Sequence, residues 1–320
     1  MRDVLAQIRA AAGSRALVDP YGSSVYAPTH ASDVDVLVSH ADPDQLATAL
    51  GLTRIFTNPP RMSGELAGKK VDITVVNGDD ARAKAMRSGP RDAVMLAAYL
   101  HDYDRDAVFQ ATWPAVKRFV KTRALGHNGL GWFGSFGWAL LLAIPLVTEL
   151  QTFEIGAAIP EWLRWLARLS LGSKVGLNGV VTTGDPFFLV APAPPTRDVA
   201  RLTKRAAMTL FEEARNAVRA IGDATTDDEA LARIPDLATD PPPGTTLVIS
   251  GLEESSRGRY DGAARGLIRE LEPMGYTRSW GRFDLDEDGW QHRITVQHGD
   301  DMRGYAQRWL AHNNIDAECI

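Results

Sequence analysis

The chain has 320 residues, of which 45% are hydrophobic and 23% charged, and its net charge is −5 at neutral pH. These proportions are ordinary for a globular protein and exclude disorder over most of the length. At about 150 residues per domain, the length predicts two domains and leaves room for a small third. The single cysteine, Cys319, excludes a disulfide framework and a cysteine-based zinc site.

Two segments bear on membranes and targeting. The first thirteen residues contain no long apolar stretch, so they do not form a signal peptide. The most apolar run, Trp138–Val147, is interrupted by Pro145 and is too short to span a bilayer. We therefore expect a cytoplasmic protein that has no membrane partner.

The N-terminal quarter is expected to form a small α/β sheet. Hydrophobic periodicity predicts the following elements: a helix at 2–12, a strand at 33–39, a helix at 44–50, and strands at 54–56 and 70–76. The segment Arg54–Glu65, which contains Asn58-Pro59-Pro60, is expected to include a loop near a cleft.

From Asp92 onward the pattern becomes helical. Helices are predicted at 93–100, 113–123, 137–150, 160–171 and 196–221. This region is also a basic island, because segment 113–220 holds 13 basic and 7 acidic residues, a net charge of +6. The last helix would place four basic side chains on one face, which is either a track for nucleic-acid phosphates or a solvated surface: Arg197, Arg201, Lys204 and Arg205.

The final third begins with an acidic and then proline-rich segment, 223–244, which is typical of a linker. The order β-α-β-β-α over 245–320 indicates a split βαβ unit. The chain is therefore predicted to be α+β. It would comprise a small mixed-sheet domain (1–90), a helical central domain (91–222), the linker and a C-terminal domain (245–320).

The strongest chemical signal is Gly22-Ser23 followed by Asp33 and Asp35 at the head of a strand, with Asp72 in a later strand. Residues two apart on a strand share a face, so the first two carboxylates lie side by side. Such carboxylates repel unless a cation sits between them, and Mg²⁺ prefers oxygen ligands of this kind. The pattern predicts a site for two metal ions, suited to displacement at phosphorus.

This arrangement resembles the polymerase-β-type nucleotidyltransferase superfamily, in which Gly-Ser precedes Asp-x-Asp and a third Asp follows. A second block, from Lys117 through Asn128 to Trp138, resembles the central domain of eukaryotic-type poly(A) polymerases. That family has a Lys, an Asn eleven residues later, and then Gly-Phe-x-Gly-Gly-x-x-Trp. The tail resembles the RNA-recognition-like C-terminal domain of the same family.

The resemblance implies a role for each matching residue. Asp33, Asp35 and Asp72 would be the catalytic residues and would hold two Mg²⁺ or Mn²⁺ ions. The nucleotide would be bound by the following residues: Gly22, Ser23, Lys117, Asn128, Gly134 and Ser135. The implied reaction is template-independent addition of a nucleoside monophosphate, AMP from ATP by preference, to the 3′-hydroxyl of single-stranded RNA, with release of pyrophosphate.

Two positions depart from the family and leave the base selectivity open. Ser88 replaces an Asn, and Gly126 replaces a Tyr that stacks on the nucleotide. The acceptor is open as well, because segment 243–320 holds 9 basic and 13 acidic residues, a net charge of −4, and no lysine. An acceptor hydroxyl on a small molecule, a nucleoside or a protein is the alternative. A non-catalytic RNA-binding protein is a further reading, disfavoured because all three Asp residues are present.

Overall fold

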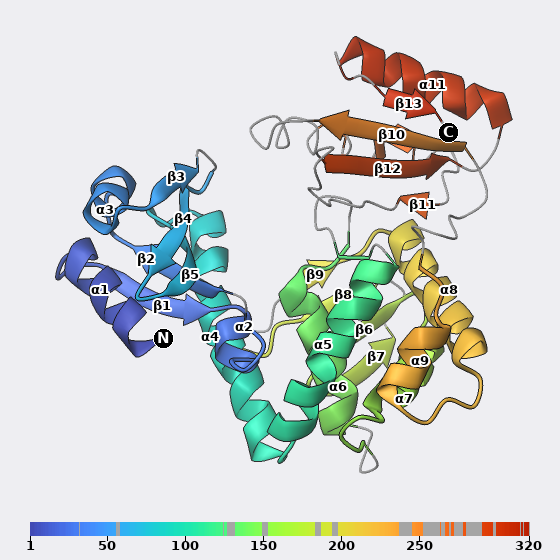
Figure 1. The fold of residues 1–320 in the computed structure, drawn as a ribbon, viewed down its shortest axis with the longest axis horizontal. Helices are drawn as coiled ribbons and strands as arrows, with labels where there is room; N and C mark the ends of the chain where they lie inside the picture. Colours follow the sequence, from blue (N-terminus) through green and yellow to red (C-terminus); the bar gives the residue numbers. More distant parts are fainter. Residues whose placement is uncertain are drawn as a thin grey trace.

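Three sheets divide the chain into an N-terminal lobe, a central lobe and a C-terminal unit (Figure 1). The computed structural model describes the following residues: 1–31, 33–55, 58–123, 125–126, 132–148, 153–182, 187–193, 198–236, 245–251, 263, 266–268, 270–271, 278–279, 290–296, 299–313, 315 and 317–319. The predicted α+β class is confirmed. Among the described residues, no helix is long and apolar enough to cross a membrane.

The N-terminal lobe is a five-stranded mixed sheet with the order β1-β2-β5-β4-β3. Its elements are α1 (Arg2–Ala12), β1 (Leu17–Tyr21), α2 (Ser23–Tyr26), β2 (Val34–Ser39), α3 (Pro43–Leu50), β3 (Thr53–Ile55), β4 (Arg61–Leu66) and β5 (Lys69–Val75). Strands β2 and β5 are parallel, and every other pair is antiparallel. Strand β2 is a nearly continuous apolar run because both of its faces are covered.

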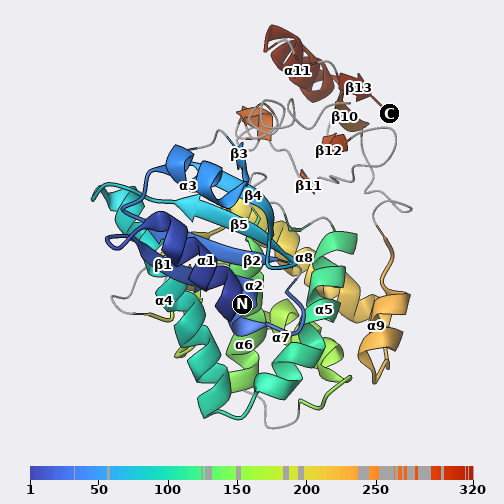
Figure 2. The same cartoon turned by 60° about the vertical axis from the view of Figure 1, so that its left-hand side comes forward.

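Helices cover both faces of this sheet. Figure 2, turned to bring the N-terminal lobe forward, shows α1 in front of the strands. On the opposite face, Leu37 and Val76 pack against Ala83 of α4 (Ala81–Asp102). The long helix α4 contacts β1 in the N-terminal lobe and α5 and α6 in the central lobe, so it joins the two lobes.

Strand β4 corrects the loop predicted over Arg54–Glu65, because Arg61–Leu66 form a strand. The sequence reasoning missed it because Ser63, Gly64 and Glu65 interrupt the apolar alternation of Met62 and Leu66. Pairing with β5 on one side and β3 on the other holds the segment extended in spite of its weak pattern.

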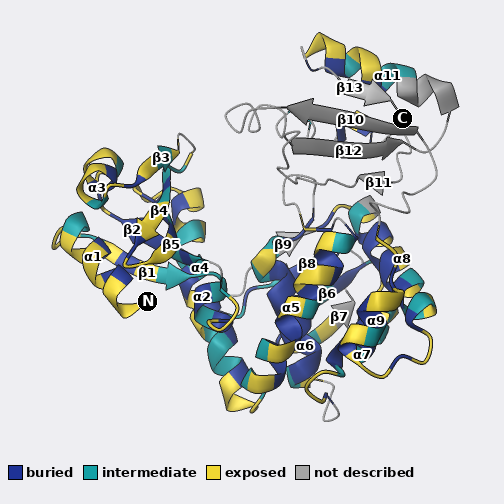
Figure 3. Cartoon of the chain, in the orientation of Figure 1, coloured by how far each residue is buried: buried dark blue, intermediate teal, exposed yellow. Residues whose placement is uncertain are grey.

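The central lobe surrounds helix α6, which is buried on nearly all sides (Figure 3). Helices α5 and α7 and strand β6 pack against it. The elements of the lobe are α5 (Asp106–Thr122), α6 (Ser135–Thr148), α7 (Ala158–Arg168), β6 (Ser173–Gly176), β7 (Gly179–Thr182), β8 (Phe188–Val190), β9 (Asp198–Arg201), α8 (Lys204–Ile221) and α9 (Asp227–Arg233). Four tryptophans of the lobe are buried, namely Trp132, Trp138, Trp162 and Trp165. The rings of Trp138 and Trp162 meet edge to face, with centroids 6.4 Å apart.

The helix predicted over 196–221 is wrong in its first part. Residues 198–201 form strand β9, which pairs with β8, and α8 starts only at Lys204. The Thr203 hydroxyl caps α8 by accepting a hydrogen bond from the Ala206 amide, at 3.2 Å. The basic face was predicted on one helix, but Arg201 lies in strand β9 and not on α8. Arg197 lies outside the described residues.

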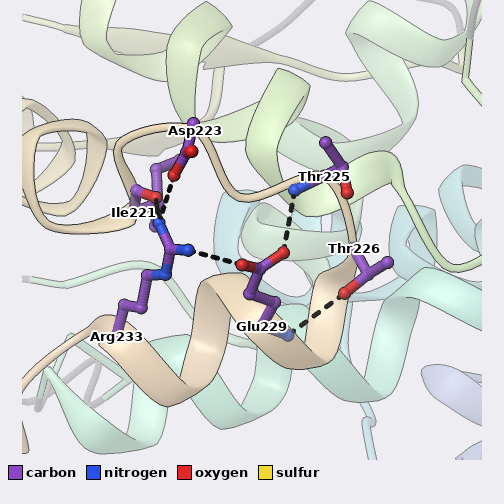
Figure 4. A network of polar contacts seen from close by, with 6 residues as sticks. All are labelled: Ile221, Asp223, Thr225, Thr226, Glu229 and Arg233. Atoms are coloured by element: carbon purple, nitrogen blue, oxygen red, sulfur yellow. Dashed lines mark hydrogen bonds and ion pairs between the residues drawn. The ribbon is translucent and has the colours of Figure 1, made fainter.

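The linker predicted over 223–244 is wrong for its first part as well. Helix α9 packs on α5, α7 and α8, and the carboxylate of its buried Asp227 accepts a hydrogen bond from the Ile159 amide, at 2.7 Å. Figure 4 shows the polar contacts that close the preceding turn, in which Arg233 contacts Asp223 and Glu229. The acidic composition of this segment therefore reflects helix capping and exposed ion pairs, while residues 237–244 lie outside the described part.

The C-terminal unit contains β10 (Thr245–Gly251), β11 (Arg278–Ser279), β12 (Trp290–Val296), α11 (Gly299–His312) and β13 (Ala317–Cys319). Its sheet has the order β11-β12-β10-β13, and every pair is antiparallel. Described residues between 263 and 271 are helical, as predicted. Strand β13 was not predicted, and it completes the split βαβ arrangement by pairing with β10.

Candidate active site

A cavity of about 660 Å³ lies between the N-terminal lobe and the central lobe. That volume is in the range of pockets that bind a nucleotide-sized ligand. Apart from Asn128, which lies outside the described residues, all the predicted site residues line it: Gly22, Ser23, Asp33, Asp35, Asp72, Lys117, Gly134 and Ser135. The fold thus brings together two motifs that are almost one hundred residues apart in the chain.

The sheet positions the carboxylates. Strands β2 and β5 run parallel and pair Asp35 directly with Asp72, while Asp33 immediately precedes β2. Side chains at paired positions of neighbouring strands point to the same face. Asp35 and Asp72 therefore point from the same face of the sheet into the cavity, which Asp33 lines as well.

The structure explains why position 22 requires a glycine, which the motif alone did not reveal. Its φ of 67° lies in the left-handed region, which glycine adopts without strain. A Cβ atom at this position would overlap the carboxylate of Asp35. The glycine therefore lets the turn before α2 approach the carboxylates closely, and it leaves Ser23 at the rim of the cavity.

Arg61 is a site residue that sequence reasoning missed. Its Nε donates to Asp72 Oδ1 at 3.3 Å, and its Nη2 forms an ion pair with the other carboxylate oxygen. No local pattern marked this residue, because its position depends on the pairing of β4 with β5, in a segment that was expected to be a loop. Arg61 neutralises Asp72 but leaves the charges of Asp33 and Asp35 next to each other.

The electrostatics reflect this crowding. Burial, followed by the charges of Asp33 and Asp72, raises the pKa of Asp35 to about 7, and Arg61 partly opposes the rise. A divalent cation would relieve this repulsion, and the all-oxygen donor set fits Mg²⁺. Among the described residues, no three acidic, histidine or cysteine side chains already converge on one point. A metal here would thus need oxygens from water or substrate to complete its coordination.

We expect metal binding to depend on pH because a proton competes for Asp35. Below pH 7 the affinity for Mg²⁺ should fall about tenfold per pH unit, since one carboxylate must lose its proton. Titration calorimetry with Mg²⁺ between pH 5.5 and 8.5 measures this dependence. In the Arg61→Gln variant the midpoint should move to higher pH, because a positive charge that lowers the pKa is lost. An affinity that is flat across this range would contradict the assignment.

The central lobe supplies the other wall of the cavity. Lys117 projects from α5, and its Nζ lies 5.8 Å from the centre of the Trp113 ring. Gly134 and Ser135 stand where α6 begins, so free backbone amides of a helix N-terminus face the same space. This wall is suited to a negatively charged ligand.

Two further carboxylates of this wall were not singled out from the sequence. Asp92 of α4 is 2% exposed and accepts a hydrogen bond from the Ala193 amide at 3.3 Å, which ties the end of β8 to α4. Asp198 of β9 forms an ion pair with Lys174 at 3.3 Å. Both line the cavity, yet neither belongs to a motif that a linear pattern could reveal.

No protein-family model and no curated protein sequence matches this chain, but solved structures do. A mutant of the Cid1 poly(U) polymerase bound to MgATP is 15% identical, with a TM-score of 0.52 over 72% of this chain and 91% of that chain. Terminal uridylyl transferase 4 from Trypanosoma brucei with bound UPU is 17% identical, with a TM-score of 0.50 over 72% of this chain and 92% of that chain. The chain has the fold of these polymerases.

The predicted fold class is therefore confirmed, and the structure of Cid1 in complex with its short product ApU is similar in fold as well. That structure is 16% identical, with a TM-score of 0.53 over 72% of this chain and 90% of that chain. At such low identity the likeness concerns the fold. The closer resemblance to eukaryotic-type poly(A) polymerases remains a prediction from the motifs.

Proposed function

We propose that this protein is a metal-dependent, template-independent nucleotidyltransferase that adds a nucleoside monophosphate to an RNA 3′-hydroxyl. The observation that carries the proposal is the pairing of Asp35 with Asp72 on parallel strands, facing Lys117 across one cavity. Phosphoryl transfer requires positioning and charge neutralisation more than covalent chemistry by the protein. These residues supply both.

Each side chain then has a part in the reaction. Asp33 and Asp35 would hold Mg²⁺, and the ion supplies neutralisation of the phosphate charge when bound. Asp72, once released from Arg61, would orient the attacking hydroxyl and accept its proton. The amide and hydroxyl of Ser23 would donate to the triphosphate on the side of the N-terminal lobe.

Lys117 provides a test of the nucleotide site. We expect Lys117→Ala to raise the KM for the nucleoside triphosphate about tenfold, because a point charge on the phosphate chain is lost. The matched control is Arg118→Ala, which removes a positive charge from the next residue of the same helix, an exposed residue outside the cavity lining. In steady-state kinetics, the KM of the control variant for the nucleoside triphosphate should equal that of the unaltered protein. Equal effects in the two variants would indicate general electrostatic attraction instead of a contact.

ATP is the nucleotide that the motifs favour, whereas two of the similar structures bear the names of uridylyl-transferring enzymes. Positions 88 and 126 depart from the poly(A) polymerase pattern at groups that would touch the base. The direct experiment incubates the protein and Mg²⁺ with each of the four labelled triphosphates and a short single-stranded RNA. Extension on a denaturing gel with one triphosphate supports the proposal and identifies the base.

The acceptor has one serious alternative. The C-terminal segment 243–320 carries a net charge of −4 and no lysine, which favours a hydroxyl on a small molecule, a nucleoside or a protein. RNA binding that weakens steeply with salt would favour an RNA end, because each phosphate contact releases counterions. Pyrophosphate release without RNA extension would favour the alternative.

A further inference from the structure

The hydroxyl of Tyr26 stands out among the polar groups of the cavity. Tyr26 ends the short helix α2, is 2% exposed and lines the cavity. Among the described residues, its hydroxyl oxygen is buried and has no hydrogen-bond partner. Leaving a buried hydroxyl without a hydrogen-bond partner destabilises the fold, so most buried hydroxyls in native proteins are paired.

The ring of Tyr26 is held firmly by its neighbours. It meets Phe109 and Trp113 edge to face at centroid distances of 6.2 and 6.1 Å, and it lies 6.0 Å from Phe136. The backbone oxygen of Tyr26 accepts a hydrogen bond from Gln110 at 2.8 Å. Because ring and backbone are both fixed, the hydroxyl cannot turn away to find a partner elsewhere.

The surroundings of the hydroxyl indicate what it would bind. Ser23 lies three residues earlier on α2, so the two side chains share one side of that helix. Asp35 is near enough for its charge to act on the hydroxyl. Trp113, which packs on Tyr26, also lies under the ammonium group of Lys117. Tyr26 thus sits between two groups suited to contact phosphate.

We propose that the Tyr26 hydroxyl donates a hydrogen bond to a phosphate oxygen of the bound nucleoside triphosphate. This inference rests on the proposed function and adds a residue to the triphosphate site. An O–H group that donates to an anionic oxygen forms a short, charge-assisted bond, stronger than one to a neutral acceptor. The unpaired state would then exist only in the ligand-free protein, and nucleotide binding would end it.

If Tyr26 binds phosphate, replacing it should weaken ligand binding without lowering the melting temperature. If its role were structural, both properties would fall together. Tyr26→Phe keeps the ring contacts and removes the unpaired oxygen, so the melting temperature of the ligand-free protein should stay the same or rise. The same substitution should weaken the binding of ATP and of inorganic tripolyphosphate, each by about fivefold to twentyfold. Tyr103→Phe, at an exposed tyrosine of the central lobe, is the matched control and should change neither property.

The experiment measures melting temperatures without ligand and dissociation constants in Mg²⁺ for both ligands, using the full chain. Weaker binding of both ligands with unimpaired stability supports the proposal. It is overturned if Tyr26→Phe binds both as tightly as the unaltered protein does, if only ATP binding weakens, or if the melting temperature falls by several degrees. If the unaltered protein binds no triphosphate at all, the proposed function fails first and the inference fails with it.

Discussion

Replacing Asp35 with asparagine is expected to abolish nucleotidyl transfer and, at the same time, to stabilise the metal-free protein at pH 8. The loss of rate should be about a thousandfold, or roughly 4 kcal/mol of transition-state stabilisation, since a ligand of the metal is removed. The stability gain follows from the pKa of Asp35, which is raised to about 7 mainly by burial. The folded state holds a proton that the unfolded state releases above pH ~4.

The sign of the pH effect follows from that difference. Because the folded-state pKa exceeds the unfolded one, the contribution of Asp35 to the free energy of unfolding falls as pH rises from about 4 to about 7. At pH 8 the charged carboxylate therefore destabilises the metal-free fold. Asparagine removes this penalty, and we expect a gain of about 1–2 kcal/mol after allowing for partial solvent screening.

The control for this prediction is Asp19→Asn on strand β1. Asp19 is exposed and lies outside the cavity lining, so both activity and stability should stay near those of the unaltered protein. Thermal melts at pH 5 and pH 8 measure the expected change in stability, and initial rates measure the expected loss of activity. An Asp35→Asn protein that is active, or that melts earlier at pH 8, would contradict the assigned role.

The second large effect concerns the buried ion pair of the central lobe. The Arg123 guanidinium contacts Glu213 through Nε at 2.7 Å and Nη2 at 2.6 Å, and it donates to the Pro235 carbonyl oxygen at 2.6 Å. Glu213 is only 2% exposed. Arg123 directly follows α5, the helix that carries Lys117, and the pair joins the end of this helix to α8 and to the segment after α9.

Arg123→Met should lower the free energy of unfolding by about 3–5 kcal/mol, because it leaves the Glu213 carboxylate buried without its cation. Urea unfolding followed by tryptophan fluorescence measures the change. The double variant Arg123→Met/Glu213→Leu should recover much of the loss, since no unpaired charge then remains in the core. A double variant no more stable than the single one would refute this explanation.

Arg233→Met is the matched control for the buried pair. Arg233 contacts Asp223 and Glu229 in the exposed network of Figure 4. Exposed ion pairs contribute about 1 kcal/mol or less, because water screens them and ordering the side chains costs entropy. The two arginines have similar numbers of partners, so the contrast in stability isolates the effect of burial.

The sequence predicted those parts of the molecule whose signal is local. Strand β2, which contains Asp35 and directly follows Asp33, could be predicted from its β-branched apolar residues. Strand β9 and the start of α8 were mispredicted because pairing with β8 decides them, and that partner is distant in sequence. Helix α9 was missed because its acidic residues resemble those of a linker.

The site residues also divide into those predicted from local sequence and those that depend on tertiary packing. Gly22, Ser23 and the carboxylates belong to a linear motif, so their shared cavity could be expected. Arg61, Asp92 and the unpaired hydroxyl of Tyr26 could not be, because each acquires its place from tertiary packing between separate elements. Linear motifs thus predicted residues that share one cavity, and the fold added residues that line this cavity or contact its carboxylates.

We propose that the residues of the cavity transfer a nucleotide to a 3′-hydroxyl. The most direct measurement supplies Mg²⁺, a triphosphate labelled at its α-phosphate, and two RNAs that differ only in a 3′-hydroxyl or a 3′-deoxy end. We expect label on the RNA with the 3′-hydroxyl, none on the 3′-deoxy RNA, and one pyrophosphate released per nucleotide added. Label on both RNAs, or label released as free nucleotide without RNA extension, would contradict it.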